Sequence, residues 1–240
     1  MTEPIQDGAA DTEWTRLRPT AATMARVMQA SASIPVAAEW LDVDMVRAQE
    51  VIAALKPKHP ELTLTNAFLW ATLTTAWHIE PYWYEYQMEG FRRRRRRRLG
   101  IAVAVATERG LTVPTLWFDE TLGLLAVANR LRDVVERARS GAASADDRIP
   151  GGLAITSVGG MGIEGGIPLP RLGEVAIFGF SSVKPAAVVR DAQILASRVV
   201  TLTGTIDHRW IDGLTLARTL IGIKNCLETL THGSVARSDM

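Results

Sequence analysis

The heptapeptide Asp207–Gly213 constrains the fold of this chain more than any other stretch, because it joins two segments of different periodicity. Before it, the run Val199–Ile206 is rich in β-branched residues and holds no charged side chain, which is typical of a strand buried on at least one face. After it, apolar residues recur at three- and four-residue steps, the period of one helix face: Leu216, Leu220, Ile223, Leu227 and Leu230. His208 is therefore predicted to lie in a tight loop between a strand and a helix.

Such a loop can hold an imidazole in one orientation, and a neutral imidazole can accept a proton near neutral pH. Asp212 stands at the predicted helix start, where a carboxylate caps backbone N–H groups or meets the positive end of the helix. We interpret His208 as a candidate general base and Asp212 as a structural carboxylate that holds its loop. A histidine four residues before an aspartate also occurs without any function, so the pair alone leaves a purely structural role open.

The pattern His208-x-x-x-Asp212-Gly213, preceded by Asp207, resembles the active-site motif of the dihydrolipoamide acyltransferases, the core components of 2-oxo acid dehydrogenase complexes. Chloramphenicol acetyltransferase shares their fold and this pattern. The resemblance runs from about Leu17 to Leu230 and includes, in order, Gly100–Pro114, Leu153–Gly162, Pro168 and Glu174–Ile177. It implies an α/β fold of the chloramphenicol acetyltransferase-like type: a single domain with a mixed β-sheet flanked by helices, assembled as a trimer.

The resemblance also implies a chemistry for the site, in which coenzyme A is a substrate and His208 takes the proton of an attacking thiol. The family places a serine or threonine hydroxyl 52 positions before the histidine, to donate to the oxyanion of the tetrahedral intermediate. Thr156 stands at that spacing and is the candidate donor, with Ser157 as the alternative. A plain strand role for Thr156 stays open. The transfer requires no metal and no covalent acyl-enzyme.

Two departures from the family's pattern lie near the amino end. Family members usually carry basic residues where Ala21 and Ala22 stand, and a histidine where this chain has Val36. Substrate handling in that region therefore does not carry over from the resemblance.

Composition sets the wider limits. A chain of 240 residues can form one large domain or two small ones, and a net charge of +1 gives no overall affinity for nucleic acid. The single cysteine, Cys226, cannot form an internal disulfide and is expected to pack in the last helix. Because we find no apolar run of membrane-spanning length and no leader-like start, we expect a cytoplasmic protein without membrane contact. We divide the chain into a lead-in (1–15), a catalytic domain (16–232) and a polar tail (233–240).

Local patterns predict the other elements. Helices are expected at 19–30, 45–55 (capped by Asp44), 62–79 (capped by Thr65 or Asn66) and 122–140, and strands at 37–43, 153–156 and 174–180. His78 is interpreted as a helix-end or surface residue and not as a metal ligand, because no second ligand type stands at useful spacing.

The segment 81–98 is the most unusual in composition. Tyr82, Trp83, Tyr84 and Tyr86 precede seven consecutive arginines, Arg92–Arg98. The aromatic group could form a binding rim, although packing on an edge strand is the commoner explanation. The arginines are consistent with a charged edge strand that resists aggregation, and also with a site for the phosphates of coenzyme A or another polyanion.

Lipoyl domains carry their lysine in an Asp-Lys-Ala type of turn, and none of the four lysines here, Lys56, Lys58, Lys184 and Lys224, has that context. We therefore expect no lipoyl domain in this chain: a lipoyl group would be presented only in trans, by a separate lipoyl or other acyl-carrier protein, or the acceptor is a small molecule. The main alternative to an acyltransferase is a catalytically silent trimeric scaffold or regulatory paralogue. A third reading is a polyanion binder that uses the arginines.

The resemblance also predicts the oligomeric state. In the family, the active site is a channel between adjacent subunits of a trimer, so His208 of one subunit should lie within reach of Thr156 of the next. Larger cages in the family are joined through an apolar carboxyl end, whereas residues 231–240 here are polar and interrupted by glycine. We therefore expect a free homotrimer.

Overall fold

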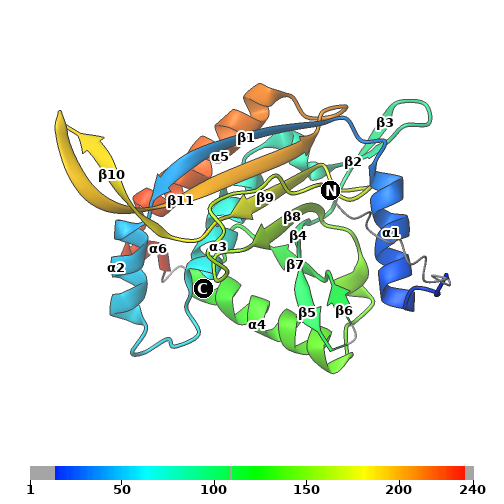
Figure 1. Cartoon of the computed structure of the whole chain (residues 1–240), viewed down its shortest axis with the longest axis horizontal. Coiled ribbons are helices and arrows are strands. Elements are labelled where there is room, and N and C mark those ends of the chain that lie inside the picture. Colours follow the sequence, from blue (N-terminus) through cyan, green and yellow to red (C-terminus); the bar gives the residue numbers. More distant parts are fainter. Residues whose placement is uncertain (1–13, 109, 236–240) are drawn as a thin grey trace, which may run out of the picture.

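The structure, a computed structural model, describes residues 14–108 and 110–235. Its centre is a seven-stranded sheet. Six of the strands follow the order β1-β11-β9-β8-β4-β7, and the seventh, β10, pairs with the amino-terminal part of β11 (Figure 1). These strands are β1 (Val36–Asp44), β4 (Leu99–Val103), β7 (Thr115–Phe118), β8 (Gly152–Ser157), β9 (Ala176–Phe180), β10 (Lys184–Arg190) and β11 (Gln193–Asp207). The sheet is mixed, because β8 runs parallel to both β4 and β9 while the other pairs are antiparallel.

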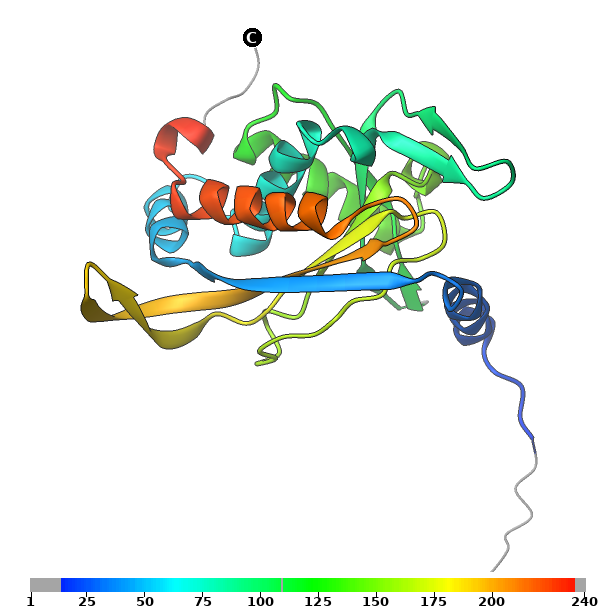
Figure 2. The ribbon, with the colours of Figure 1, turned by 90° about the horizontal axis from the view of Figure 1, so that it is seen from above.

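Six α-helices accompany the sheet in the described part of the chain: α1 (Pro19–Ser31), α2 (Val46–Leu55), α3 (Leu64–Trp77), α4 (Leu124–Ser140), α5 (Gly213–Glu228) and α6 (His232–Val235). Helix α5 lies on one side of the long strands β1 and β11, and the connection between β8 and β9 crosses the other side (Figure 2). The predicted α/β architecture, a mixed sheet flanked by helices, is confirmed. None of the helices in the described ranges is long and apolar enough to cross a bilayer.

Side chains of β11 alternate between these two sides, as the pleat requires. Leu202 and Ile206 are fully buried in the core that also holds Leu216 of α5. Gly204 lets α5 approach closely, because a Cβ there would lie 2.6 Å from Leu216 Cδ1. Thr201 and Thr203 consequently face the opposite side of the sheet, away from α5.

Two small hairpins lie outside the sheet. β2 (Tyr84–Gln87) pairs with β3 (Arg92–Arg95), and β5 (Val105–Thr107) pairs with β6 (Gly110–Thr112). Single 3-10 turns occupy η1 (Glu80–Trp83) and η2 (Asp146–Arg148). The expected exposed edge strand is present at Arg92–Arg95, but it pairs in a separate hairpin and not in the central sheet, and Arg96–Arg98 lead from it into β4.

Several local expectations also need correction. Helix α2 has Met45 as its N-cap residue, although Asp44 Oδ1 still accepts from Val46 N at 3.0 Å. Helix α3 is capped by Thr63, which forms a reciprocal capping box with Asn66 and not the predicted cap at Thr65. Strand β11 is much longer than the predicted run, and its hairpin with β10 was not foreseen.

The carboxyl end departs from the predicted polar tail in a similar way. Residues from 233 onward were expected to be a tail, but α6 extends to Val235, whose side chain is buried. Residues 236–240 and most of the lead-in 1–15 lie outside the described residues. The domain limits 1–15, 16–232 and 233–240 therefore stay a prediction.

Candidate active site

His208 lies at the end of β11, in the loop that leads into α5, as the sequence predicted. Its backbone N–H donates to Pro35 O at 2.9 Å, and its ring Nδ1 is 3.0 Å from Ile211 O. A carbonyl oxygen only accepts hydrogen bonds, so a neutral ring in this position carries its proton on Nδ1. Nε2 is then the atom with a free lone pair. Because the side chain is exposed, that lone pair is accessible to an incoming proton donor.

A buried ion pair braces this loop. Asp207, whose side chain is 4% exposed, accepts from Arg209 Nε at 2.8 Å and from Arg209 Nη2 at 2.6 Å. The same carboxylate also accepts from the Arg209 backbone N–H at 3.1 Å, which closes a tight turn around His208. The sequence interpretation gave the supporting role to Asp212 alone and missed this pair. The signal was present, because an acid and a base flank the histidine directly.

Asp212 caps helix α5, in agreement with the prediction for the helix start. Its Oδ1 accepts from Thr215 N at 2.7 Å. These hydrogen bonds from Thr215 hold the pKa of the Asp212 carboxyl below its usual range, and Arg218 and His208 contribute in the same direction. The carboxylate therefore stays ionised near neutral pH and fixes where the loop ends and the helix begins.

Thr156 lies near the end of β8, on the side of the sheet that faces away from α5. In the strand register it stands beside Gly179 of β9, which in turn stands beside Thr203 of β11. A cavity of about 240 Å³ opens there, lined by residues that include Thr156, Gly179, Pro168, Thr201 and Thr203. Within the described part of the chain we find no hydrogen-bond partner for Thr156 Oγ1, so its hydroxyl is available to a ligand. The fallback residue Ser157 is exposed, and its Oγ accepts from Gly159 N at 3.4 Å.

The structure does not bring Thr156 and His208 of one chain together. Thr203, which is two strands from Thr156, is five residues before His208 on β11. At roughly 3.3 Å per residue and about 4.8 Å per strand spacing, the two residues are separated by on the order of 15–20 Å. Groups that act on one transition state must lie within about 3 Å of the reacting atoms, so this distance excludes a shared site within a single chain.

The surroundings of the His208 loop include two residues that the sequence interpretation did not connect with it. Trp210 stacks on Tyr86 of β2, with ring centroids 5.0 Å apart and planes 14° apart. The packing role predicted for the aromatic segment is confirmed, because Tyr82 and Trp83 are buried in the core and Tyr84 and Tyr86 of β2 pack against it. The contact of Tyr86 with Trp210 was not predicted. Val36, where the family usually has a histidine, is exposed at the start of β1 and pairs with Asp207 in register.

His78 ends helix α3 on the surface, with Nε2 3.8 Å from Glu120 Oε1, which agrees with its interpretation as a helix-end residue. Across the ranges that the structure describes, no three histidine, cysteine, aspartate or glutamate side chains form a group that could hold a metal ion. Burial raises the pKa of the Cys226 thiol, which lies on the buried side of α5 near Thr75. A thiol of that kind is a packing residue.

Comparison with solved structures places this fold among known ones. A dihydrolipoamide acetyltransferase of Azotobacter vinelandii superposes with a TM-score of 0.83 at 22% identity, covering 96% of this chain and 98% of that chain. The cubic core of a pyruvate dehydrogenase multienzyme complex gives the same values. A chloramphenicol acetyltransferase superposes more loosely, with a TM-score of 0.51 at 16% identity over 84% of this chain and 94% of that one. The fold is therefore that of the chloramphenicol acetyltransferase-like α/β domains.

Sequence comparison narrows this class to a family. Residues 9–233 match the profile of the 2-oxoacid dehydrogenases acyltransferase (catalytic domain), and the chain belongs to that family. A dihydrolipoyllysine-residue acetyltransferase component of the pyruvate dehydrogenase complex from Bacillus subtilis (strain 168) is 31% identical over 121 residues, half of this chain. The match covers only 27% of that relative's length.

Proposed function

We propose that this domain is a coenzyme A-dependent acyltransferase whose active site is completed between two neighbouring subunits of a homotrimer. In this proposal His208 of one subunit is the general base and Thr156 of the next donates to the oxyanion. The observation that carries it is the distance between the two residues within one chain, on the order of 15–20 Å, together with the free Nε2 and the free hydroxyl.

The spacing of the candidate residues supports their roles. The serine, histidine and asparagine studied in the catalytic mechanism of the Azotobacter vinelandii enzyme follow one another at separations of 52 and 4 positions. Thr156, His208 and Asp212 follow one another at the same separations. Threonine keeps the hydroxyl of serine, and both aspartate and asparagine can cap a helix.

The proposed chemistry needs only these groups. His208 Nε2 takes the proton of a thiol, and the sulfur attacks the carbonyl carbon of a thioester. The carbonyl oxygen becomes an oxyanion, which accepts a hydrogen bond from the hydroxyl of Thr156. When the intermediate collapses, the second sulfur leaves with the bonding pair and recovers the proton from His208. The buried Asp207–Arg209 pair and the Asp212 cap keep the imidazole in place during both steps.

Exposed apolar residues support the assembly. The side of the sheet that carries Thr156 also carries Trp40, which is 64% exposed and pairs with Thr203. The β8–β9 connection that crosses this side adds more exposed large hydrophobic side chains: Met161, Ile163, Ile167, Leu169 and Leu172. So much apolar surface around one cavity is typical of a face that a second subunit covers. We further propose that the trimer is free and does not join a cage.

The carriers of the acyl group belong to the proposal as well. Coenzyme A is one thiol partner, and the other is a lipoyl group or a different thiol. A lipoyl group would be presented from outside this domain, because no lysine here has the sequence context of a lipoyl attachment site. The cytoplasmic location expected from the sequence stays a prediction.

Mixed trimers test the shared site directly. Chains with His208→Ala and chains with Thr156→Val are unfolded, mixed in equal amounts and reassembled. If the site is shared, one interface in every mixed trimer unites an intact His208 with an intact Thr156, so activity should return to about a quarter of the wild-type value. If both residues serve one chain, no intact site can form and the mixture stays as inactive as its parts.

Light scattering should give roughly three times the 26.2 kDa chain mass. A stable, active monomer or a cage of many chains would contradict the proposed assembly.

A further inference from the structure

The arginine tract Arg92–Arg98 has no role in the proposed acyl transfer, yet it is held in an ordered arrangement. Three of the seven arginines pair with carboxylates: Arg93 with Glu80 at 3.4 Å, Arg94 with Glu85 at 2.6 Å, and Arg98 with Asp146. Among the described residues the other four have no carboxylate partner. The tract therefore keeps an excess of positive charge that the rest of the chain does not neutralise.

Two side chains of the tract lie over aromatic rings of the preceding segment. Arg93 lies over the ring of Tyr84, with 4.1 Å from its Cζ to the ring centroid, and Arg95 lies over Trp83 at 5.2 Å. Arg94–Arg98 line a cavity of about 450 Å³ together with Glu85, Trp117, Ile149 and Pro150. That volume is in the range of small-molecule sites.

Arg96 lines this cavity and is the least exposed of the seven arginines. Its Nη1 donates to Pro150 O at 2.8 Å, and its Nε lies 3.4 Å from Tyr84 O. Gly152, with φ +92°, leaves the space that it needs, because a Cβ there would stand 2.9 Å from Arg96 Nε. Nη2 has no hydrogen-bond partner among the described residues and is left for a ligand. Burial lowers the pKa of the Arg96 guanidinium; Glu85 opposes this shift and Arg94 adds to it. Among the described residues Arg96 has carbonyl partners but no carboxylate within ion-pair distance, and a half-buried cation of this kind is a favourable position for an anion.

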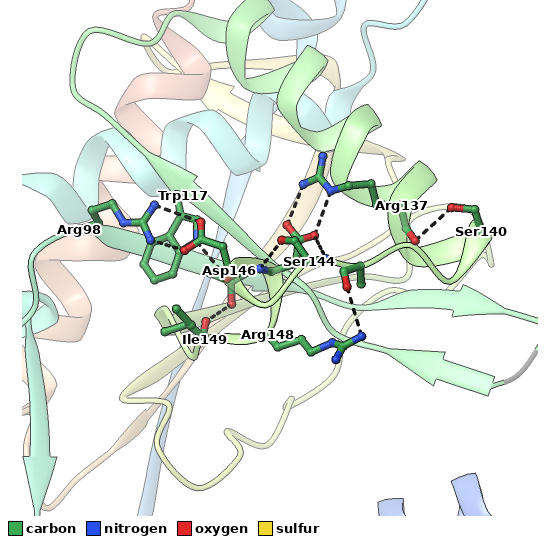
Figure 3. A network of polar contacts seen from close by, with 11 residues as sticks. Arg98, Trp117, Arg137, Ser140, Ser144, Asp146, Arg148 and Ile149 are labelled. Carbon is green, nitrogen blue, oxygen red and sulfur yellow. Dashed lines mark hydrogen bonds and ion pairs between the residues drawn. The ribbon is translucent and has the colours of Figure 1, made fainter.

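The wall beside Arg96 is flat and partly apolar. Figure 3 shows Arg98 reaching Asp146 next to the indole of Trp117, with Ile149 close by. Arg98 Cζ lies 4.2 Å from the centroid of the Trp117 ring, and Ile149 is 47% exposed. A purely ionic ligand would not use this wall, whereas a ligand with an anionic end and a planar or apolar body would use both parts of the cavity.

We propose that this arginine cavity binds the phosphate groups of a nucleoside phosphate, with Arg96 as the central phosphate ligand and the Trp117–Ile149 wall facing the rest of the molecule. The cavity is separate from the residues of the proposed active site. Arg96 binds at Pro150, before the start of β8, while Thr156 lies near the far end of that strand, and three strand spacings separate β4 from the strand that carries His208. The inference does not rest on the proposed acyl transfer.

The test measures binding to the full chain by titration calorimetry, with ADP, adenosine, inorganic pyrophosphate and a single-stranded oligonucleotide as probes. Arg96→Gln removes the central charge. Arg92→Gln is the matched control, because it removes the same charge from the same hairpin but does not line the cavity. Thermal unfolding would reveal whether Arg96→Gln loosens the hairpin. If it does, Arg97→Gln serves as the second test, because Arg97 is exposed and also lines the cavity. His208→Ala is included because it separates this site from the active site.

We expect saturable ADP binding, none by adenosine, and pyrophosphate binding weaker than that of ADP. The affinity for ADP should fall at least about tenfold in Arg96→Gln, about threefold or more in Arg97→Gln, and less than about twofold in Arg92→Gln. His208→Ala should bind ADP normally, even if the acyl transfer proposal fails. Three results would overturn the inference: no saturable ADP binding, equal losses in Arg92→Gln and Arg96→Gln, or oligonucleotide binding that strengthens with each added nucleotide and exceeds that of ADP.

Discussion

The two halves of the candidate active site differ in how completely the single chain builds them. Around His208 the polar groups are satisfied locally: the ring by Ile211 O, the backbone by Pro35 O, and Asp207 by Arg209. Around Thr156 the hydroxyl faces a cavity, and the chain that crosses it is glycine-rich and exposes its large apolar side chains. The first half is preorganised by the fold, whereas in the proposed function a neighbouring subunit would complete the second.

In the proposed function, this difference accounts for the distance between His208 and Thr156 within one chain, because each residue would act with its counterpart on a neighbouring subunit. A base needs a fixed tautomer and orientation, which short-range contacts in a strand-to-helix loop supply. An oxyanion donor works best in a water-excluded place, and an open sheet face becomes such a place only when it is covered. Association would therefore supply the desolvation that the isolated chain lacks. Four changes test this comparison.

The largest effect on acyl transfer is expected from a change in the His208 half of the site. His208→Ala removes the proposed general base and should reduce acyl transfer by at least about a hundredfold. The thermal unfolding midpoint and the trimer mass should not change, because the imidazole is exposed. Steady-state rates with acyl-coenzyme A and a dithiol acceptor measure this, and His78→Ala serves as the control. Near-normal rates in a folded His208→Ala variant would exclude the role.

A change in the Thr156 half of the site should reduce activity less than His208→Ala does, and the loss should appear mainly in kcat. Thr156→Val keeps the shape of the side chain and removes only its hydroxyl, so kcat should fall about tenfold to a hundredfold while KM changes little. Ser157→Ala, one residue away and exposed, should leave the rate within about twofold. If the two results were exchanged, Ser157 would be the donor and the alignment of β8 with the neighbour would have to shift by one residue.

The brace of the His208 loop can be broken without touching the imidazole. Asp207→Asn leaves Arg209, which is 19% exposed, without its counter-charge, so unfolding free energy should fall by about 3 kcal/mol. Urea denaturation measures the loss. Asp146→Asn is the control, since it breaks the half-exposed pair with Arg98 and should cost much less. Equal losses in the two variants would mean that the Asp207–Arg209 pair does not brace the loop.

The sequence predicted the strand, loop and helix around His208 because each is encoded locally, by β-branched residues, by Asp212 at the cap and by one apolar helix face. It also predicted the α/β sheet and the helix boundaries to within a few residues. The separation between Thr156 and His208 was not predictable from spacing. It depends on the register of β8, β9 and β11, which only long-range pairing determines.

Two further errors have the same origin. The hairpin of the arginines was not predicted because alternation in a charged run does not reveal the partner strand, and β2 became that partner through the turn at Gly90 and Phe91, both with positive φ. The hairpin of β10 and β11 turns at Asp191 and Ala192, also at positive φ, without the glycine that usually marks such a turn. The Asp207–Arg209 pair was not predicted because the resemblance assigns a role to Asp212 and none to the residues that flank His208.

The smallest effect is expected from substitution of Asp212, and the dependence of the stability loss on pH provides the test. The pKa of this carboxyl is lower in the folded protein than its usual value of 3.8, mainly through hydrogen bonds from Thr215. The charged form therefore stabilises the fold above about pH 3.8, and this contribution is lost as the pH falls through the lowered folded-state pKa. Asp212→Ala should be less stable than the wild type at pH 7, and the difference should shrink as the pH is lowered from about 4.5 toward 3. Asp212→Asn, which can still cap the helix, should lose less stability and less activity than Asp212→Ala. If Asp212→Asn instead lost activity as completely as His208→Ala while its stability stayed at the wild-type level, the carboxylate charge itself would act in the reaction, and the His208 half of the site would depend on more than its loop geometry.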